Sequence, residues 1–115
     1  MASPALTCTM LLAFAGLHAS SLALADPQSA DDEVMIELAW DSGCFNCHDV
    51  HEHIRGPAWA EVARRYRGDE GAFERLVEKV IVGGSGNWGD DAMSPNRRVR
   101  EEDIRALVGW LLTLE

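Results

Sequence analysis

Basic residues are missing from the first half of this chain. Residues 1–53 of the 115-residue sequence contain no Lys or Arg, whereas residues 54–115 hold all ten. Residues 26–53 also carry eight acidic side chains, and the net charge of the chain is −9. We therefore expect no nucleic-acid partner. The acidic segment 26–53 is either a surface that steers the protein towards a complementary partner or a solubilising face.

The sequence is also poor in cysteine and in long hydrophobic runs. The cysteines are Cys8, Cys44 and Cys47, and the early hydrophobic run covers residues 10–17. Ala23-Leu24-Ala25 fits a small-residue cleavage site, so residues 1–25 are predicted to be a signal peptide. Its removal would leave residues 26–115 as one domain in the periplasm. Retention as an N-terminal anchor is the alternative, because the segment lacks the usual basic start. No second long hydrophobic run follows, so no stable membrane insertion is expected after cleavage.

No segment alternates in the way that indicates a strand, and the apolar residues recur at helical spacing instead. Helices are predicted over residues 31–40, 58–66 and 101–114. A third helix in chain order is predicted to be capped by Asp69 and ended by Gly83-Gly84. Acidic residues at positions 31–33 and 101–103 are expected in the first turns of their helices. The sequence therefore predicts an all-α fold.

The stretch Cys44-Phe45-Asn46-Cys47-His48 carries the clearest chemical signal. Two cysteines separated by two residues and followed at once by histidine indicate an attachment site for c-type haem. Each thiol can add to one vinyl group of the porphyrin, and the imidazole of His48 can then serve as an axial ligand of the iron. We predict one covalent haem c, held by Cys44, Cys47 and His48.

Three other interpretations of the two cysteines remain open from the motif alone. Cys44 and Cys47 could form half of a zinc site with His51 and His53, although structural zinc sites usually have a wider gap before their histidines. They could be a thioredoxin-like redox pair, but that motif needs a βαβ context, which the neighbouring sequence lacks. A disulfide between them would leave His48 without a role.

A second axial ligand must come from elsewhere in the chain. Without residues 1–25, the remaining methionines are Met35 and Met93. Met35 falls on the apolar face of the first predicted helix and is expected in the core. Met93 lies in a polar loop and is predicted to be the sulfur ligand. The Pro57 carbonyl could accept a hydrogen bond from His48 Nδ1 and fix the ring's tautomer, or it could simply belong to a turn.

Residues 84–89 match the pattern G-x-G-x-x-G, a fingerprint of dinucleotide binding. That fingerprint follows a strand and opens a helix, whereas these residues follow a predicted helix and open a loop. We interpret them as a flexible turn that brings the chain across the haem. The indole N–H of Trp88 could then reach a haem propionate.

With these motifs in place, residues 31–115 resemble the small bacterial class I cytochromes c. The resemblance is closest to the short periplasmic carriers that donate electrons to cytochrome cd-type nitrite reductase or to terminal oxidases. The matched pieces are residues 43–48, Gly56-Pro57, residues 83–89, residues 93–96 and the last helix around Trp110. The family implies four or so short helices wrapped around one haem, with the first and last helices crossing. It also implies that Asn96 supports the Met93 side and that Lys79, like Trp88, reaches a propionate.

The resemblance implies an electron carrier rather than an enzyme. An iron bound by both His48 and Met93 has no open position and can pass one electron with little rearrangement. The expected partners are redox proteins: a donor such as a bc1-type complex or another cytochrome, and an acceptor such as a terminal reductase or oxidase. We expect a monomer. The alternatives are a haem subunit of a larger membrane redox complex or, if Met93 is labile, a haem enzyme or sensor.

Overall fold

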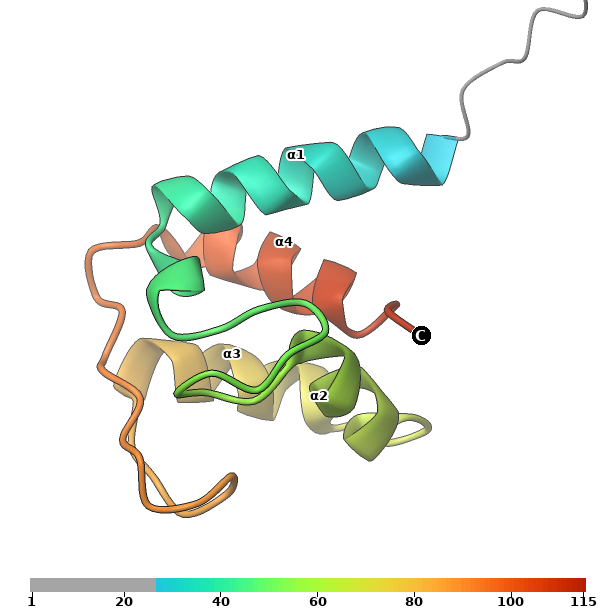
Figure 1. Cartoon of the computed structure of the whole chain (residues 1–115). Helices are drawn as coiled ribbons and strands as arrows, with labels where there is room; N and C mark the ends of the chain where they lie inside the picture. The colour runs from blue at the N-terminus through green and yellow to red at the C-terminus, as the bar shows by residue number, and fades with distance from the viewer. Residues whose placement is uncertain (1–26) are drawn as a thin grey trace, which may run out of the picture.

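The computed structural model describes residues 27–115 as four α-helices and one short 3-10 helix (Figure 1). The elements are α1 (Pro27–Asp41), η1 (Cys44–Asn46), α2 (Trp59–Tyr66), α3 (Ala72–Val82) and α4 (Glu101–Leu111). Within this range there is no strand, only an isolated bridge between Gly84 and Met93, so the predicted all-α fold is confirmed. None of these helices has the length and apolar character needed to cross a membrane. The predicted signal peptide, residues 1–25, lies outside the described range.

The last helix, α4, is the element on which the others pack. It contacts α1, α2 and α3, and Figure 1 shows it directly beneath α1. Its apolar stripe explains this position, because the stripe is buried: Ile104, Leu107, Val108 and Leu111. The first and last helices are therefore in contact, as their predicted crossing requires.

The main core lies between α1, α2 and α4 and is rich in tryptophan. Its buried members are Ala39, Trp59, Val62, Leu107, Trp110 and Leu111. The rings of Trp59 and Trp110 meet edge to face at a centroid distance of 5.8 Å, a favourable arrangement for two aromatic rings. Ala39 is fully buried in the same cluster.

One polar contact fastens the two ends of the described chain together. Trp110 Nε1 donates a hydrogen bond of 2.7 Å to Asp32 Oδ1. Because the acceptor is ionised, such a bond contributes about 1.5–3 kcal/mol to stability. Trp110 thus packs into the core with its ring and ties α4 to α1 with its single polar atom.

Three helices begin at residues other than those predicted, although α2 differs by a single residue because Ala58 is its N-cap. The first begins at Pro27 rather than Asp31, because proline at the first helical position loses no hydrogen bond and already has the helical φ. Asp31 therefore lies beyond the first turn. The helix α3 begins at Ala72 with Gly71 at its N-cap, so the predicted cap at Asp69 is wrong. Asp69 instead accepts a 3.0 Å hydrogen bond from the Gly71 N–H and stabilises the turn before the helix.

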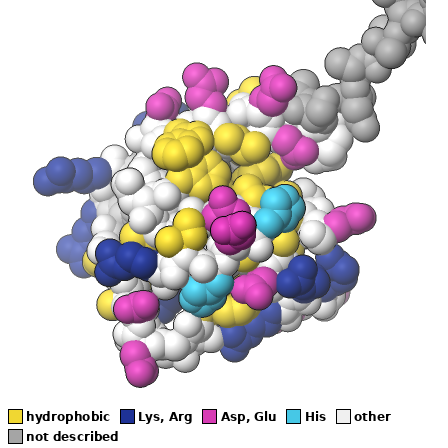
Figure 2. Space-filling view, in the orientation of Figure 1, with side chains coloured by type: hydrophobic (Ala, Val, Ile, Leu, Met, Phe, Trp, Pro, Cys, Tyr) yellow, Lys and Arg dark blue, Asp and Glu magenta, His cyan; other side chains and the backbone are white. Residues whose placement is uncertain are grey.

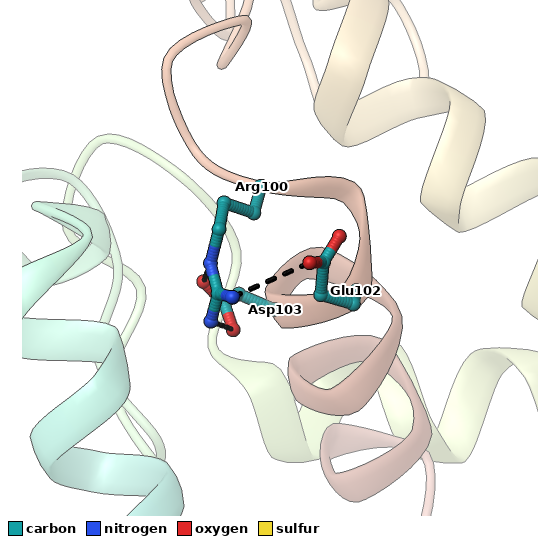
Figure 3. A network of polar contacts seen from close by, with 3 residues as sticks. All are labelled: Arg100, Glu102 and Asp103. Carbon is teal, nitrogen blue, oxygen red and sulfur yellow. Dashed lines mark hydrogen bonds and ion pairs between the residues drawn. The ribbon is translucent and has the colours of Figure 1, made fainter.

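The start of α4 agrees with the prediction, and its end does not. Arg100 donates hydrogen bonds of 2.9 and 2.7 Å to the two carboxylate oxygens of Asp103 and one of 3.3 Å to Glu102 (Figure 3). Both acids lie in the first turn, where negative charge is favourable next to the positive end of the helix dipole. The helix ends at Leu111 rather than at residue 114.

Candidate functional site

The two cysteines of the predicted attachment motif lie on and just after η1. Gly43 leads into this short helix with φ at +74°, a conformation that favours glycine. The Cys44 carbonyl accepts hydrogen bonds from the N–H groups of Cys47 at 3.2 Å and His48 at 3.0 Å. The motif is therefore wound into a compact turn that holds the three chemically important side chains near one another.

The state of these cysteines bears on the other interpretations of the motif. Both thiols are free and half-buried, so they form no disulfide. Burial raises the pKa of the Cys44 thiol. His51 and His53 are exposed, and no three His, Cys, Asp or Glu side chains within residues 27–115 lie close enough together to hold a metal ion. The two-cysteine, two-histidine zinc arrangement is therefore not formed.

The imidazole of His48 is fixed in position and tautomer. Its Nδ1 lies 2.9 Å from the Pro57 carbonyl oxygen, and a carbonyl can only accept, so the proton is on Nδ1 and Nε2 keeps its lone pair. Burial also lowers the pKa of His48, although the hydrogen bond to Pro57 opposes this shift. A neutral imidazole with a free Nε2 is the form that binds a metal ion.

The loop between His48 and α2 is held by backbone hydrogen bonds along its length. The Gly56 N–H donates to the Cys47 carbonyl at 2.8 Å, which closes the loop next to the motif. The Trp59 N–H donates to the Asp49 carbonyl at 3.0 Å and so joins the loop to the first residue of α2. The Asp49 carboxylate accepts two backbone N–H groups of the following turn, and these hydrogen bonds lower its pKa.

A cavity of about 360 Å³ lies next to the motif. Its polar and sulfur-bearing lining includes every residue predicted for the haem site: Cys44, Cys47, His48, Pro57, Lys79, Trp88, Met93 and Asn96. Much of the remaining wall is apolar, formed by residues such as Val62, Leu76, Val80, Ile104, Leu107 and Val108. Two thiols, one imidazole and one thioether around an apolar hollow are the donor set and surroundings that suit a covalently attached haem.

The two methionines are placed differently. Met93 lines the cavity, and its backbone is fixed because its N–H and carbonyl each form a 2.9 Å hydrogen bond with Gly84. Met35 does not line the cavity and instead packs against the main core cluster. The core position predicted for Met35 is therefore confirmed, and Met93 is the methionine beside the predicted haem.

The chain around Met93 is anchored to α3. The backbone N–H of Asn96 donates to the Val80 carbonyl at 3.1 Å, and its side-chain Nδ2 reaches the same carbonyl at 3.3 Å and the Ser94 carbonyl at 3.0 Å. At the other end, Gly83 has φ at +76°, and a Cβ there would lie 2.4 Å from the Met93 carbonyl oxygen. This close approach requires glycine.

Two residues contribute to the site in ways that the sequence did not predict. Gly56 lies against the His48 ring, and a Cβ at this position would come within 2.4 Å of His48 Cε1. Arg65 places its guanidinium 4.5 Å from the centroid of the Trp88 ring and donates a 2.6 Å hydrogen bond to the Asn87 carbonyl. Only the tertiary structure brings Arg65 to this loop, so neither contact has a local sequence signal.

Comparisons with known proteins identify the family of this chain. A family model described as cytochrome c matches residues 37–115. Cytochrome c-551 of Allochromatium vinosum is 47% identical over 103 residues, which cover 90% of this chain and 100% of that protein. Cytochrome c-552 of Nitrosomonas europaea is 37% identical over 84% of this chain and 90% of that protein. The crystal structure of wild-type Nitrosomonas europaea cytochrome c552 is similar with a TM-score of 0.67 and 38% identity, over 70% of this chain and 99% of that one.

Proposed function

Because the chain belongs to the cytochrome c family, we propose that it is a periplasmic carrier that delivers single electrons to a terminal respiratory acceptor, such as a nitrite reductase or an oxidase. It binds one haem c covalently, and it is an electron-transfer protein rather than an enzyme. Its donor in this proposal is a bc1-type complex or another cytochrome. Cleavage of residues 1–25 would release residues 26–115 as a monomer.

One observation supports this function above the others: Cys44, Cys47, His48 and Met93 line the same cavity. When bound, the haem supplies an iron that gains and loses one electron. In our proposal the cysteines attach the group and fix its edge. His48 presents Nε2, because Pro57 holds the proton on Nδ1. Met93 would supply a second protein ligand to the iron, and methionine ligation raises the reduction potential.

The remaining residues of the predicted site have supporting roles in this proposal. Asn96 keeps the Met93 segment on α3 through its two side-chain hydrogen bonds. Lys79 and Trp88 line the cavity and would hold the haem propionates, Lys79 by charge and Trp88 by its indole N–H. Arg65 packs on the Trp88 ring and keeps the indole in place.

An absorption spectrum of the periplasmically matured protein tests the proposed ligation. We expect a weak far-red band in the oxidised form, which reports the bond between the Met93 sulfur and the iron, and a redox titration with one single-electron step. Met93→Ala should lose the band, and Met35→Leu, which nearly conserves core volume, should keep it. A high-spin spectrum that shifts on addition of cyanide or nitric oxide would contradict the carrier and favour a ligand sensor.

A further inference from the structure

One face of α1 carries large apolar side chains that the rest of the molecule leaves uncovered. Ile36 and Trp40 lie four residues apart and so on the same side of the helix. The side chain of Trp40 is 64% exposed and that of Ile36 is 36% exposed. Neither residue lines the haem cavity, so a bound haem would not cover them.

Trp40 is exposed, but its side chain is held in place by packing. Its ring packs against the ring of Phe45 at a centroid distance of 5.0 Å, and Phe45 packs in turn on the buried Trp59 at 5.0 Å. A tryptophan that is already ordered loses little conformational entropy when a partner covers it, and tryptophan is one of the commonest anchor residues of protein interfaces.

Acidic side chains run along this apolar pair. Glu33, Glu37 and Asp41 are all exposed on the same helix. Helical geometry places Glu37 next to Trp40 and Glu33 next to Ile36. Among the residues that the structure describes, none of these three acids forms an ion pair. Figure 2 shows acidic side chains along the edge of the molecule formed by α1, with hydrophobic side chains gathered directly beneath them.

This face also lies next to the haem attachment site. The helix α1 ends at Asp41, and η1, which begins at Cys44, packs against it. A protein seated on Trp40 would therefore lie beside the edge of the cavity where the first thioether forms. Such closeness is what electron exchange between two proteins requires.

We propose that Glu33, Ile36, Glu37, Trp40 and Asp41 form a docking face for a redox protein that presents Lys or Arg side chains around an apolar centre. This inference rests on the proposed carrier function. The uncompensated acids attract a basic surface and speed its approach, and Trp40 anchors the complex once water is displaced. A second copy of this chain is a poor occupant, because it would bring its own acids against them.

Electron exchange with a basic probe protein tests the docking face. The reduced holoprotein is mixed by stopped flow with oxidised mitochondrial cytochrome c, a lysine-rich redox protein, at increasing ionic strength. We expect the second-order rate constant to fall about tenfold between low and physiological salt. Glu33→Lys with Glu37→Lys should lower the low-salt rate about tenfold and remove most of the salt dependence. Trp40→Ala should slow exchange about tenfold while the salt dependence remains.

Substitutions on α3 provide the control, with Glu78→Lys compared with Glu37→Lys alone and Val82→Ala compared with Trp40→Ala. Glu78 is exposed and Val82 is 56% exposed, so Glu78→Lys and Val82→Ala change charge and apolar surface away from α1 and should leave the rate unchanged. Equal effects of the α1 and α3 substitutions would overturn the docking face. A change in sedimentation of Trp40→Ala would assign the face to a second copy and would also overturn the proposal.

A small oxidant distinguishes failure of the docking face from failure of the proposed carrier function. The wild type and every variant should be oxidised by hexacyanoferrate(III), which needs no protein docking. If the wild type reacts with this reagent but its exchange with the basic probe does not depend on salt, the docking face is wrong and the carrier stands. If the wild type does not react with the reagent at all, the carrier function itself fails.

Discussion

The two segments that frame the haem cavity are held in different ways. Residues 44–57 carry both cysteines and His48, and hydrogen bonds from α2 and from within the segment fix them. Residues 83–96 carry Met93 and are fixed by the Gly84–Met93 pair and by Asn96. The first segment would form three bonds to the haem group, two of them covalent bonds to the porphyrin, and the second would form one. We therefore expect the methionine side to be the weaker half of the site.

The surroundings of the two segments differ in burial. Each segment has an exposed stretch, residues 51–55 in the first and 84–87 in the second. The first segment, however, runs directly into the buried residues Ala58, Trp59 and Ala60, whereas the second contains glycines with positive φ at positions 84, 86 and 89. Regions with few buried contacts open at lower free energy than the rest of a protein. We therefore expect the bond to Met93 to be lost before the bond to His48 as the protein is stressed.

Gly83→Ala should have the largest effect, because it should displace Met93 and remove its bond to the iron. The change puts a Cβ within 2.4 Å of the Met93 carbonyl oxygen at a φ of +76°. The backbone conformation alone costs about 1–3 kcal/mol for a residue other than glycine, and the clash must also move residues 93–95. We expect loss of the far-red band and a lower free energy of unfolding, measured by absorption and by denaturant titration.

Gly86→Ala is the matched control for this substitution. Gly86 has φ at +100°, but a Cβ there meets nothing within 4 Å. The Gly86→Ala variant should therefore be destabilised by backbone strain but keep the far-red band. Loss of the band in both variants would mean that strain in the loop, rather than the contact with Met93, governs the ligand.

Gly56→Ala should have an effect of intermediate size, and it should lower stability without removing the far-red band. Its Cβ would lie 2.4 Å from His48 Cε1, and an overfilled position of this kind costs about 1–3 kcal/mol. Because the covalent bonds and the surrounding hydrogen bonds keep His48 near the iron, the cost should appear as lower stability with the far-red band retained. Denaturant titration of the holoprotein measures it, with absorption followed in the same samples.

The control for Gly56→Ala lies in α4. Gly109 is helical, and a Cβ there would be 3.7 Å from the nearest atom of Phe73. Gly109→Ala should therefore stabilise the protein by about 0.5–1 kcal/mol, since alanine favours a helix interior over glycine. If Gly56→Ala removed the far-red band as fully as Gly83→Ala, the two segments would be equally fragile and the comparison would be wrong.

Asn96→Ala should weaken the anchoring of the Met93 segment and should have the smallest effect of these substitutions. It removes two side-chain hydrogen bonds to the Val80 and Ser94 carbonyls and should cost about 1–2 kcal/mol. The Asn96 backbone hydrogen bond remains, so we expect the far-red band at neutral pH but its disappearance at a lower denaturant concentration than in the wild type. If the band disappeared at the same denaturant concentration in Asn96→Ala as in the wild type, Asn96 would not support Met93.

The parts of the site that could be predicted are those with a local signal. The motif of residues 44–48 is contiguous. Helical spacing alone distinguished Met35, which packs against the core, from Met93 in the loop. The hydrogen bond between His48 and Pro57 spans nine residues. It could be predicted because the Pro57 carbonyl can accept a hydrogen bond from the His48 ring. The all-α fold followed from periodicity, which is a property of short segments.

The parts that could not be predicted depend on contacts between distant segments. Nothing near Gly56 in the sequence says that an imidazole will lie against its Cα, and nothing near Arg65 says that Trp88 will pack on it. The helix starts were missed for a related reason. Acidic residues at 31–33 and Asp69 are typical of a first turn or a cap, but Pro27 and the turn around Gly71 decided where the helices begin.

The hydrogen bond between Trp110 and Asp32 has a consequence for the order in which the protein can be made. Synthesis runs from the amino end, so Trp110, which binds Asp32 and packs on Trp59, is made 78 residues after Asp32. A growing chain that lacks α4 leaves its tryptophan core open. We therefore expect the polypeptide to close around the attachment site only after α4 has been made, so that both thiols stay reachable for the addition of haem until then.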